Sequence, residues 1–264
     1  MAEIAMADAP ASPASGTHAL VLEGVGRSFG ALVALEGISL AIEAGERLAI
    51  LGANGAGKTT LFNVITGDYR PDRGRVVFFG EDVTALPPHQ RIRRGLRRTY
   101  QSSILFRSLS VADSLFLAAC GATRGRFSLR RPPATHPNRI RARELASLAG
   151  LAEVGDVVVG DLSHGQQRQL EVALALAGAP RVILFDEPAA GLSPVERQHL
   201  IRLLRGLPRH IGYIIIEHDL DVALRVADKV TVMHQGRIFK QGTPQQIESD
   251  AEVQAIYLGG VRHG

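Results

Sequence analysis

Apolar and polar positions recur with two different periods along the chain, and the changes of period predict alternating strands and helices. Short apolar or alternating runs predict strands, and apolar residues three or four positions apart predict helices. The predicted strands cover residues 18–22, 38–42, 47–51, 75–79, 182–185, 213–216, 229–234 and 237–241. The predicted helices cover residues 58–66, 140–149, 166–177, 195–204, 219–227 and 244–256. Such alternation is typical of a layered α/β fold.

The middle of the chain departs from this alternation. Residues 87–119 have a helical pattern with a break near 100–107, and 121–138 are rich in Gly, Pro and Arg without any period. A strand-poor stretch over 87–165 predicts a helical subdomain inserted into the α/β fold, with 121–138 as a loop. Residues 1–17 are rich in Ala, Ser and Pro and predict a disordered lead-in without the features of a signal peptide.

Composition excludes several classes of protein. The chain has 264 residues, of which 45% are hydrophobic and 21% are charged, so a mainly disordered or coiled-coil protein is excluded. No apolar run approaches the roughly 20 residues that cross a bilayer. The single cysteine, Cys120, excludes an intramolecular disulfide and fits a reducing compartment.

A glycine-rich segment between a predicted strand and a predicted helix fits the pattern G-x-x-x-x-G-K-[ST]. Its members are Gly52, Ala53, Asn54, Gly55, Ala56, Gly57, Lys58 and Thr59. Glycines let the backbone curl so that N–H groups point at phosphate oxygens, and the N-terminus of the next helix favours an anion. We expect Lys58 to reach the β- and γ-phosphates, Thr59 to offer its hydroxyl to Mg²⁺, and Thr60 to complete the nucleotide-binding segment.

Two carboxylates, Asp186 and Glu187, follow the buried strand predicted at 182–185. A strand end beside a phosphate loop suits a carboxylate that binds hydrated Mg²⁺, so we expect this role for Asp186. The adjacent Glu187 is the candidate base that takes a proton from an attacking water. Together with the phosphate loop, this pair predicts a nucleoside triphosphatase.

Five further segments, in order, resemble motifs of ATP-binding cassette (ABC) proteins. Leu162-Ser-His-Gly-Gln resembles the signature motif LSGGQ, with His164 in place of a glycine. Phe29 resembles the aromatic residue that stacks on adenine, and Gln101 resembles the Q-loop glutamine. Gly191-Leu-Ser-Pro resembles the D-loop, and His218 resembles the switch histidine. Six motifs in this order, the phosphate loop included, form a specific resemblance over residues 20–240.

The resemblance implies a P-loop NTPase core of the RecA-like ABC type, an α/β fold with an antiparallel β subdomain and an inserted α-helical subdomain. The implied ABC ATPase domain covers residues 18–260. Its parts are a nucleotide-binding core at 18–100 and 166–242, a helical signature subdomain at 101–165 and a C-terminal helix at 243–260.

The same resemblance implies ATP and Mg²⁺ as cofactors and a head-to-tail dimer with two ATP molecules in the interface. Ser163, Gly165 and Gln166 would contact the ATP held by the other subunit. His218 would contact the γ-phosphate, and Gln101 would contact Mg²⁺. Glu187, His218 and Gln101 are therefore the implied catalytic residues.

Local strings narrow the resemblance to the branched-chain amino acid importer ATPases, with urea importer ATPases as close relatives. The strings are Ile65-Thr-Gly-Asp-Tyr-Arg-Pro, Gly95-Leu-Arg-Arg-Thr-Tyr-Gln101, Glu217-His-Asp-Leu-Asp-Val-Ala223 and Val253-Gln-Ala-Ile-Tyr-Leu-Gly259. Tyr100 stands where phenylalanine is usual, and Ser193 stands where most ABC proteins have aspartate. An importer ATPase of this kind implies a second ABC ATPase subunit (the same chain or a paralogue), two integral-membrane permeases and, indirectly, a substrate-binding protein. It would lie at the cytoplasmic face of the inner membrane.

Several alternatives stay open. The transported substrate cannot be inferred from an ATPase subunit, so urea, short amides and aromatic acids remain beside branched-chain amino acids. A lipid-type exporter would share the same motifs. A soluble ABC ATPase of DNA repair or translation usually has two cassettes or a long coiled-coil insertion, and neither pattern is found here.

A cluster of arginines also needs an explanation. Thirteen arginines lie between Arg91 and Arg143, where Asp113 is the only acidic residue. One interpretation is a solvated face, and another is contact with membrane subunits and anionic lipid headgroups. Nucleic-acid binding is disfavoured, because aromatic residues for stacking are sparse in this region, and we expect no nucleic-acid partner.

Overall fold

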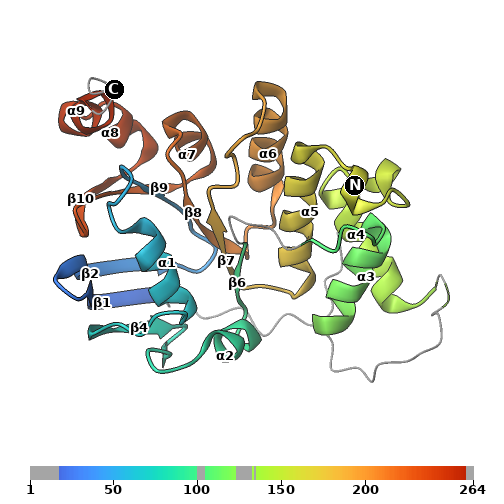
Figure 1. Ribbon diagram of the computed structural model, residues 1–264, viewed down its shortest axis with the longest axis horizontal. Helices are drawn as coiled ribbons and strands as arrows, with labels where there is room; N and C mark the ends of the chain where they lie inside the picture. Colours follow the sequence, from blue (N-terminus) through green and yellow to red (C-terminus); the bar gives the residue numbers. More distant parts are fainter. Residues whose placement is uncertain (1–17, 100–104, 123–132, 134, 260–264) are drawn as a thin grey trace.

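The computed structural model describes residues 18–99, 105–122, 133 and 135–259. Within these ranges the strands form two sheets (Figure 1). The four-stranded antiparallel sheet has the order β2 (Leu32–Glu43), β1 (His18–Phe29), β4 (Arg73–Phe78), β5 (Glu81–Asp82). The six-stranded sheet has the order β10 (Arg237–Gly242), β9 (Lys229–His234), β3 (Arg47–Leu51), β8 (Gly212–Ile216), β7 (Val182–Asp186), β6 (Leu96–Arg98). Strands β9 to β6 run parallel, whereas β10 pairs antiparallel with β9.

The central strands β3, β7 and β8 are buried at every position, because both faces of their sheet are covered. Alternate residues of these strands enter two different hydrophobic cores. Ile50 and Leu184 pack with α1 (Lys58–Thr66) and the antiparallel sheet. Ala49 and Ile183 pack on the other face with α5 (His164–Ala177), α6 (Pro194–Gly206) and α7 (Leu220–Val226). The two-residue period of a strand therefore places α1 and α5 on opposite faces of the six-stranded sheet.

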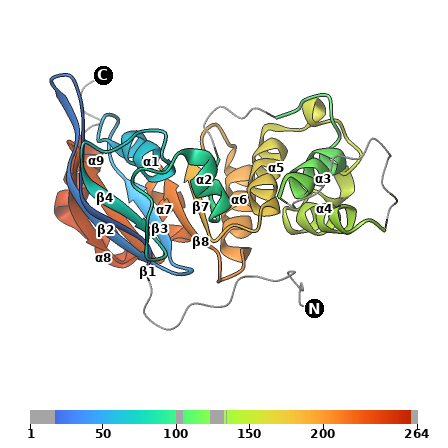
Figure 2. The same cartoon turned by 90° about the horizontal axis from the view of Figure 1, so that it is seen from below.

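A helical subdomain extends one end of the molecule. Helices α3 (Val111–Ala122) and α4 (Pro137–Leu148) pack against each other and against α5, and two short 3₁₀ helices cover Ala152–Val154 and Val159–Asp161. The antiparallel sheet lies at the opposite end (Figure 2). Helix α2 (Pro88–Arg93) precedes β6. In the part of the chain that the structure describes, none of the helices has the length and apolar character that a bilayer span requires.

Two predictions about secondary structure were wrong. The helical pattern at 87–119 is interrupted by the edge strand β6, which pairs with β7 although two of its three residues are arginines. The single helix predicted at 244–256 is two helices, α8 (Pro244–Glu248) and α9 (Ala251–Gly259). The break occurs because Asp250 Oδ1 accepts the N–H groups of Glu252 and Val253 and so begins a new helix.

The arginine cluster does not lie on one solvated face. Arg91 is 1% exposed, and its guanidinium donates to the carbonyls of Val64 and Ile65 at the end of α1. A cation suits the C-terminal end of a helix, where free carbonyls concentrate negative partial charge. Burial also lowers the pKa of Arg97.

The lead-in 1–17 and four arginines of the cluster lie outside the described residues; the four are Arg124, Arg126, Arg130 and Arg131.

Candidate active site

The phosphate-loop segment joins β3 to α1, and its glycines occupy positions that other residues cannot adopt without strain. Gly57 is the N-cap of α1 with a φ of 97°, and a Cβ there would lie 2.5 Å from the carbonyl oxygen of Ala34. At Gly52, with a φ of 158°, a Cβ would lie 2.5 Å from the carbonyl oxygen of Met233. Because Gly57 offers no side chain to cap α1, the first N–H groups of the helix are available for an anion.

Lys58 is the first residue of α1 and is only 6% exposed. Its Nζ donates to the carbonyl oxygens of Gly52 at 2.6 Å and Ala53 at 3.0 Å. Burial lowers the pKa of Lys58, and the nearby carboxylates of Glu187 and Asp186 oppose this effect. The loop lysine and the two carboxylates at the end of β7 therefore lie within electrostatic reach of one another. Thr59 and Thr60 follow in the first turn of α1.

Asp186, the last residue of β7, is held by an arginine that sequence reasoning missed. Arg98 Nη2 lies 2.7 Å from Asp186 Oδ2, and the two side chains are 7% and 5% exposed. Arg98 Nη1 also donates to Asn63 Oδ1 of α1 at 2.5 Å. Strand β6 thus supplies a cation that fixes Asp186 against the helix of the phosphate loop.

Glu187 adopts a left-handed backbone conformation with a φ of 48°, which is rare for a residue with a side chain. Its N–H donates to the carbonyl of Ile216 at the end of β8, and its own carbonyl accepts the N–H of Ala190. His218 Nδ1 lies 3.5 Å from Glu187 Oε1. Backbone strain of this kind persists only where the surrounding structure fixes the residue. Glu187 and His218 therefore lie side by side, just beyond the ends of the adjacent strands β7 and β8.

Glu217 is a second residue that the sequence did not reveal as part of this region. It is fully buried, and its Oε1 accepts the N–H of Ala189 at 2.9 Å. Among the described residues, Oε2 has no hydrogen-bond partner. Burial raises the pKa of the Glu217 carboxyl to about 7. This side chain ties the end of β8 to the segment that follows Glu187.

We expect the Glu217→Gln variant to differ from the unaltered protein in how stability depends on pH. The folded state binds the Glu217 proton more tightly than the unfolded state does, because its pKa rises from 4.5 to about 7. This contribution to stability is full below about pH 4 and is lost as the pH rises through 7. Between pH 4.5 and 7.5 the unaltered protein should lose about 3 kcal/mol of unfolding free energy relative to the variant.

Urea denaturation at several pH values measures this difference. Glutamine has the shape of the protonated carboxyl and keeps an acceptor for Ala189. The exposed Glu153→Gln change is the control and should give a curve parallel to that of the unaltered protein. Parallel curves for Glu217→Gln as well would contradict the assigned protonation of Glu217.

The signature residues lie at the start of α5. Ser163 is the N-cap, and its side chain accepts the N–H of Gln166 while the Gln166 side chain accepts the N–H of Ser163. Gly165 is buried in the first turn. His164 Nε2 lies 3.3 Å from the carbonyl oxygen of Ala190. Because α1 and α5 cover opposite faces of the sheet, the chain does not bring these residues onto its own phosphate loop.

Phe29 ends β1 and is 40% exposed. Tyr69, which sequence reasoning missed, packs edge-on against it with ring centroids 5.3 Å apart. The Arg27 guanidinium lies 4.9 Å from the centre of the Phe29 ring and is paired with Asp72 at 2.6 Å. An exposed aromatic ring held in this way suits stacking with a planar base.

The remaining predicted site residue, Gln101, lies outside the described residues. The donors that the structure does describe fit Mg²⁺ in type: Thr59 presents a hydroxyl and Asp186 a carboxylate, and Mg²⁺ prefers oxygen ligands. The described part of the chain holds no cluster of three His, Cys, Asp or Glu side chains that could form a metal cage. Such a sparse set is typical of Mg²⁺ that is shared with the phosphates of a substrate.

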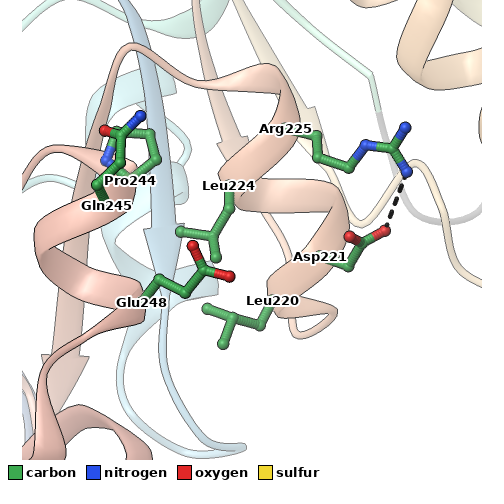
Figure 3. A pocket seen from close by; sticks show the side chains of 7 residues that line it. All are labelled: Leu220, Asp221, Leu224, Arg225, Pro244, Gln245 and Glu248. Carbon is green, nitrogen blue, oxygen red and sulfur yellow. Dashed lines mark hydrogen bonds and ion pairs between the residues drawn. The ribbon is translucent and has the colours of Figure 1, made fainter.

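A separate hollow of about 330 Å³ lies between α7 and α8 (Figure 3). Its lining residues are Leu220, Asp221, Leu224, Arg225, Pro244, Gln245 and Glu248. Asp221 and Arg225 form an ion pair at its rim. None of the predicted site residues lines this hollow.

Comparison with known proteins identifies the family. The family described as ABC transporter matches residues 35–190. The chain belongs to the ABC transporter family. The ABC chain is 35% identical over 248 residues to BraF of Pseudomonas aeruginosa, a high-affinity branched-chain amino acid transport ATP-binding protein; the match covers 91% of this chain and 97% of BraF. It is 36% identical over 235 residues to LptB of Acidithiobacillus ferridurans, a lipopolysaccharide export system ATP-binding protein, covering 88% and 93%.

The ABC fold is also found in solved structures. The ADP conformation of MJ1267, an ATP-binding cassette of an ABC transporter, matches with a TM-score of 0.81 and 30% identity over 92% of this chain and 100% of that one. The predicted α/β fold of the P-loop ABC type is therefore confirmed. The ABC chain is the ATP-hydrolysing subunit of a transporter.

Proposed function

We propose that this ABC subunit dimerises on ATP and powers an importer of branched-chain or related amino acids. The similarity to BraF over nearly the whole chain supports the substrate class. The LivG proteins of Salmonella typhimurium and Escherichia coli, which are branched-chain amino acid transport ATP-binding proteins, are 35% and 34% identical over a similar length.

The observation that carries the hydrolytic part of this proposal is the placement of Glu187 against His218, with Lys58 close by. Glu187 takes the proton of the attacking water, and His218 orients the γ-phosphate and the Glu187 carboxylate. Lys58 and the N–H groups of the phosphate loop hold the β- and γ-phosphates, while Phe29 stacks on adenine. Thr59, Asp186 and Gln101 would hold Mg²⁺, which neutralises charge on the phosphates when it is bound.

The packing of α1 and α5 on opposite faces of the six-stranded sheet supports a dimer, because one chain does not bring its own signature residues onto its phosphate loop. A single chain carries both halves of an ATP site, the phosphate loop after β3 and the signature residues Ser163, Gly165 and Gln166 near the end of β7, without bringing them together. In a head-to-tail pair, the signature residues of one subunit face the phosphate loop of the other and close each ATP site. The second subunit is either the same chain or a paralogue.

The helical subdomain, which we assign to 101–165 within a domain at 18–260, is the proposed contact with two permeases. It carries a hollow of about 230 Å³ lined by Leu105, Phe106, Ser114, Leu117, Ala118 and Leu174. Phe106 is 67% exposed and Leu117 is 46% exposed, so apolar surface is available at this hollow. Docking there would hold the subunit at the cytoplasmic face of the inner membrane, and a substrate-binding protein would act through the permeases.

The match to LptB supports a second candidate, the ATPase of a lipid-type exporter. Both functions use the same ATP chemistry and differ in the membrane partner. A reconstituted complex therefore has to separate them.

The test is ATP hydrolysis by the chain reconstituted in liposomes with its two permeases and its binding protein. We expect leucine, isoleucine or valine to stimulate hydrolysis severalfold, and urea or lipopolysaccharide to have no effect. The Lys58→Ala complex is the control, because it should not respond to any substrate. Stimulation by lipopolysaccharide, or no response to any amino acid, would contradict the importer.

A further inference from the structure

The carboxylate of Glu196 bridges the N-termini of two helices. Glu196 is the third residue of α6, and its Oε2 accepts the N–H of Ser193 at 3.0 Å and the Ser193 hydroxyl at 2.8 Å. Its Oε1 reaches α5, where it accepts the N–H of Gly165 at 2.9 Å and lies 3.5 Å from Ser163 Oγ. One side chain thus joins the D-loop segment to the signature segment of the same chain.

The contact with Gly165 is close. A Cβ at Gly165 would lie 2.6 Å from both Cγ and Oε1 of Glu196. The hydrogen bonds from Ser193 and Gly165 lower the pKa of the Glu196 carboxyl, so the group is ionised at neutral pH. The first turn of α5 therefore holds an anion that the chain itself supplies.

This anion occupies the donors that the proposed function gives to a nucleotide. The N–H groups of a helix N-terminus and a capping serine suit a phosphate oxygen for the same reason that they suit a carboxylate. The Gly165 N–H can donate fully to one acceptor at a time. A γ-phosphate carried by the other subunit and the Glu196 carboxylate, both negative, therefore compete for one position.

We propose that Glu196 sets the affinity of the dimer for ATP, because its carboxylate occupies the signature donors of the separate subunit and the γ-phosphate must displace it. This inference rests on the proposed function, in which Ser163 and Gly165 face the ATP of the other subunit. Displacement leaves Glu196 bound to Ser193, so helix α6 keeps its cap during the exchange.

Capping alone does not require a charge at this position. Helices α5 and α8 have the same capping box with glutamine, Gln166 and Gln246, in the place of Glu196. Gln246 Oε1 accepts the N–H of Thr243 at 2.8 Å. A glutamine at 196 would likewise accept the N–H of Ser193 through its Oε1. Its NH₂ group would then face Gly165 and could not accept the Gly165 N–H. The Glu196→Gln variant therefore separates the cap from the competition.

The experiment measures ATP-dependent dimerisation by analytical ultracentrifugation over a range of ATP concentrations. Two proteins are compared in separate experiments. Both carry Glu187→Gln to block hydrolysis, and the second also carries Glu196→Gln. We expect Glu196→Gln to lower the ATP concentration at half-dimerisation about tenfold, since a charge-assisted hydrogen bond no longer has to be replaced. With Glu187 intact, the KM for ATP should fall by a similar factor while kcat changes less than twofold.

Exposed Glu153→Gln removes the same charge away from both helix N-termini and should leave the midpoint unchanged. A merely structural role for Glu196 would raise the ATP requirement or lower thermal stability, and would not lower the midpoint. If the Glu196→Gln protein dimerises at an unchanged or higher ATP concentration, the inference about Glu196 is overturned and the proposed function is not. Failure of the chain with Glu196 intact to dimerise with ATP, either with itself or with its paralogue, would overturn the proposed function, and the inference with it.

Discussion

Replacement of Glu187 with glutamine is expected to reduce ATP turnover at least a hundredfold while ATP binding remains. Glutamine keeps the size of the side chain and its contact with His218, but it cannot take a proton from water. General base catalysis contributes about 10²- to 10⁴-fold to a rate, which sets the expected loss. Because the phosphates are then retained, the dimer should accumulate. Steady-state ATPase assays, binding of a fluorescent ATP analogue and size-exclusion chromatography in ATP measure the three effects.

Glu248→Gln is the matched control for this variant. Glu248 is an exposed glutamate that lines the hollow between α7 and α8, away from the phosphate loop (Figure 3). Its replacement should leave turnover unchanged. Retention of more than a third of the activity in Glu187→Gln would show that another group acts as the base, and a monomer in saturating ATP would contradict the expected accumulation of the dimer.

Replacement of Arg98 with methionine should destabilise the folded chain by about 3–5 kcal/mol. Asp186 and Arg98 are both almost completely buried, so removal of the guanidinium leaves a carboxylate without compensation in a poorly solvated place. Asn63 also loses a donor. Urea denaturation without nucleotide measures this loss independently of catalysis.

A double variant separates the ion pair from packing. Arg98→Met with Asp186→Leu removes both charges and should recover most of the lost stability, because apolar groups of similar volume tolerate burial. Arg94→Met is the control: Arg94 pairs with Glu81 at 2.6 Å, but this pair is largely solvated and its loss should have little effect. A change of similar size in Arg94→Met would mean that burial of the Arg98 pair is not the cause.

The local patterns of the sequence predict the parts of the fold that local forces determine. The apolar runs of β3, β7 and β8 predict buried strands, and Gly57 and Lys58 predict the turn into α1. A serine just before an apolar helical period is a typical helix cap, and Ser163 caps α5. These features depend on neighbours within a few residues, so a single sequence contains the necessary information.

The missed residues depend on partners that are distant along the chain. Arg98 meets Asp186 across 88 residues, and Glu217 meets Ala189 across 28. A charged residue in a short segment has the same pattern whether it is solvated or buried against a partner, so Arg98 looked like part of a surface cluster. Glu196 stands two residues after the D-loop string Gly191-Leu-Ser-Pro without a motif of its own, and its bond to Gly165 requires the packing of α6 on α5. The role of Gln101 stays a prediction.

Separation of the phosphate loop from the signature segment by one sheet has a genetic consequence for the proposed dimer. A lesion at Lys58 and a lesion at Ser163 would damage opposite halves of a composite site. When two inactive alleles with these different lesions share a cell, a mixed pair contains one site with both lesions and one site with neither. In a dimer of two copies of this chain, such alleles would complement each other, whereas two alleles with the same lesion would not.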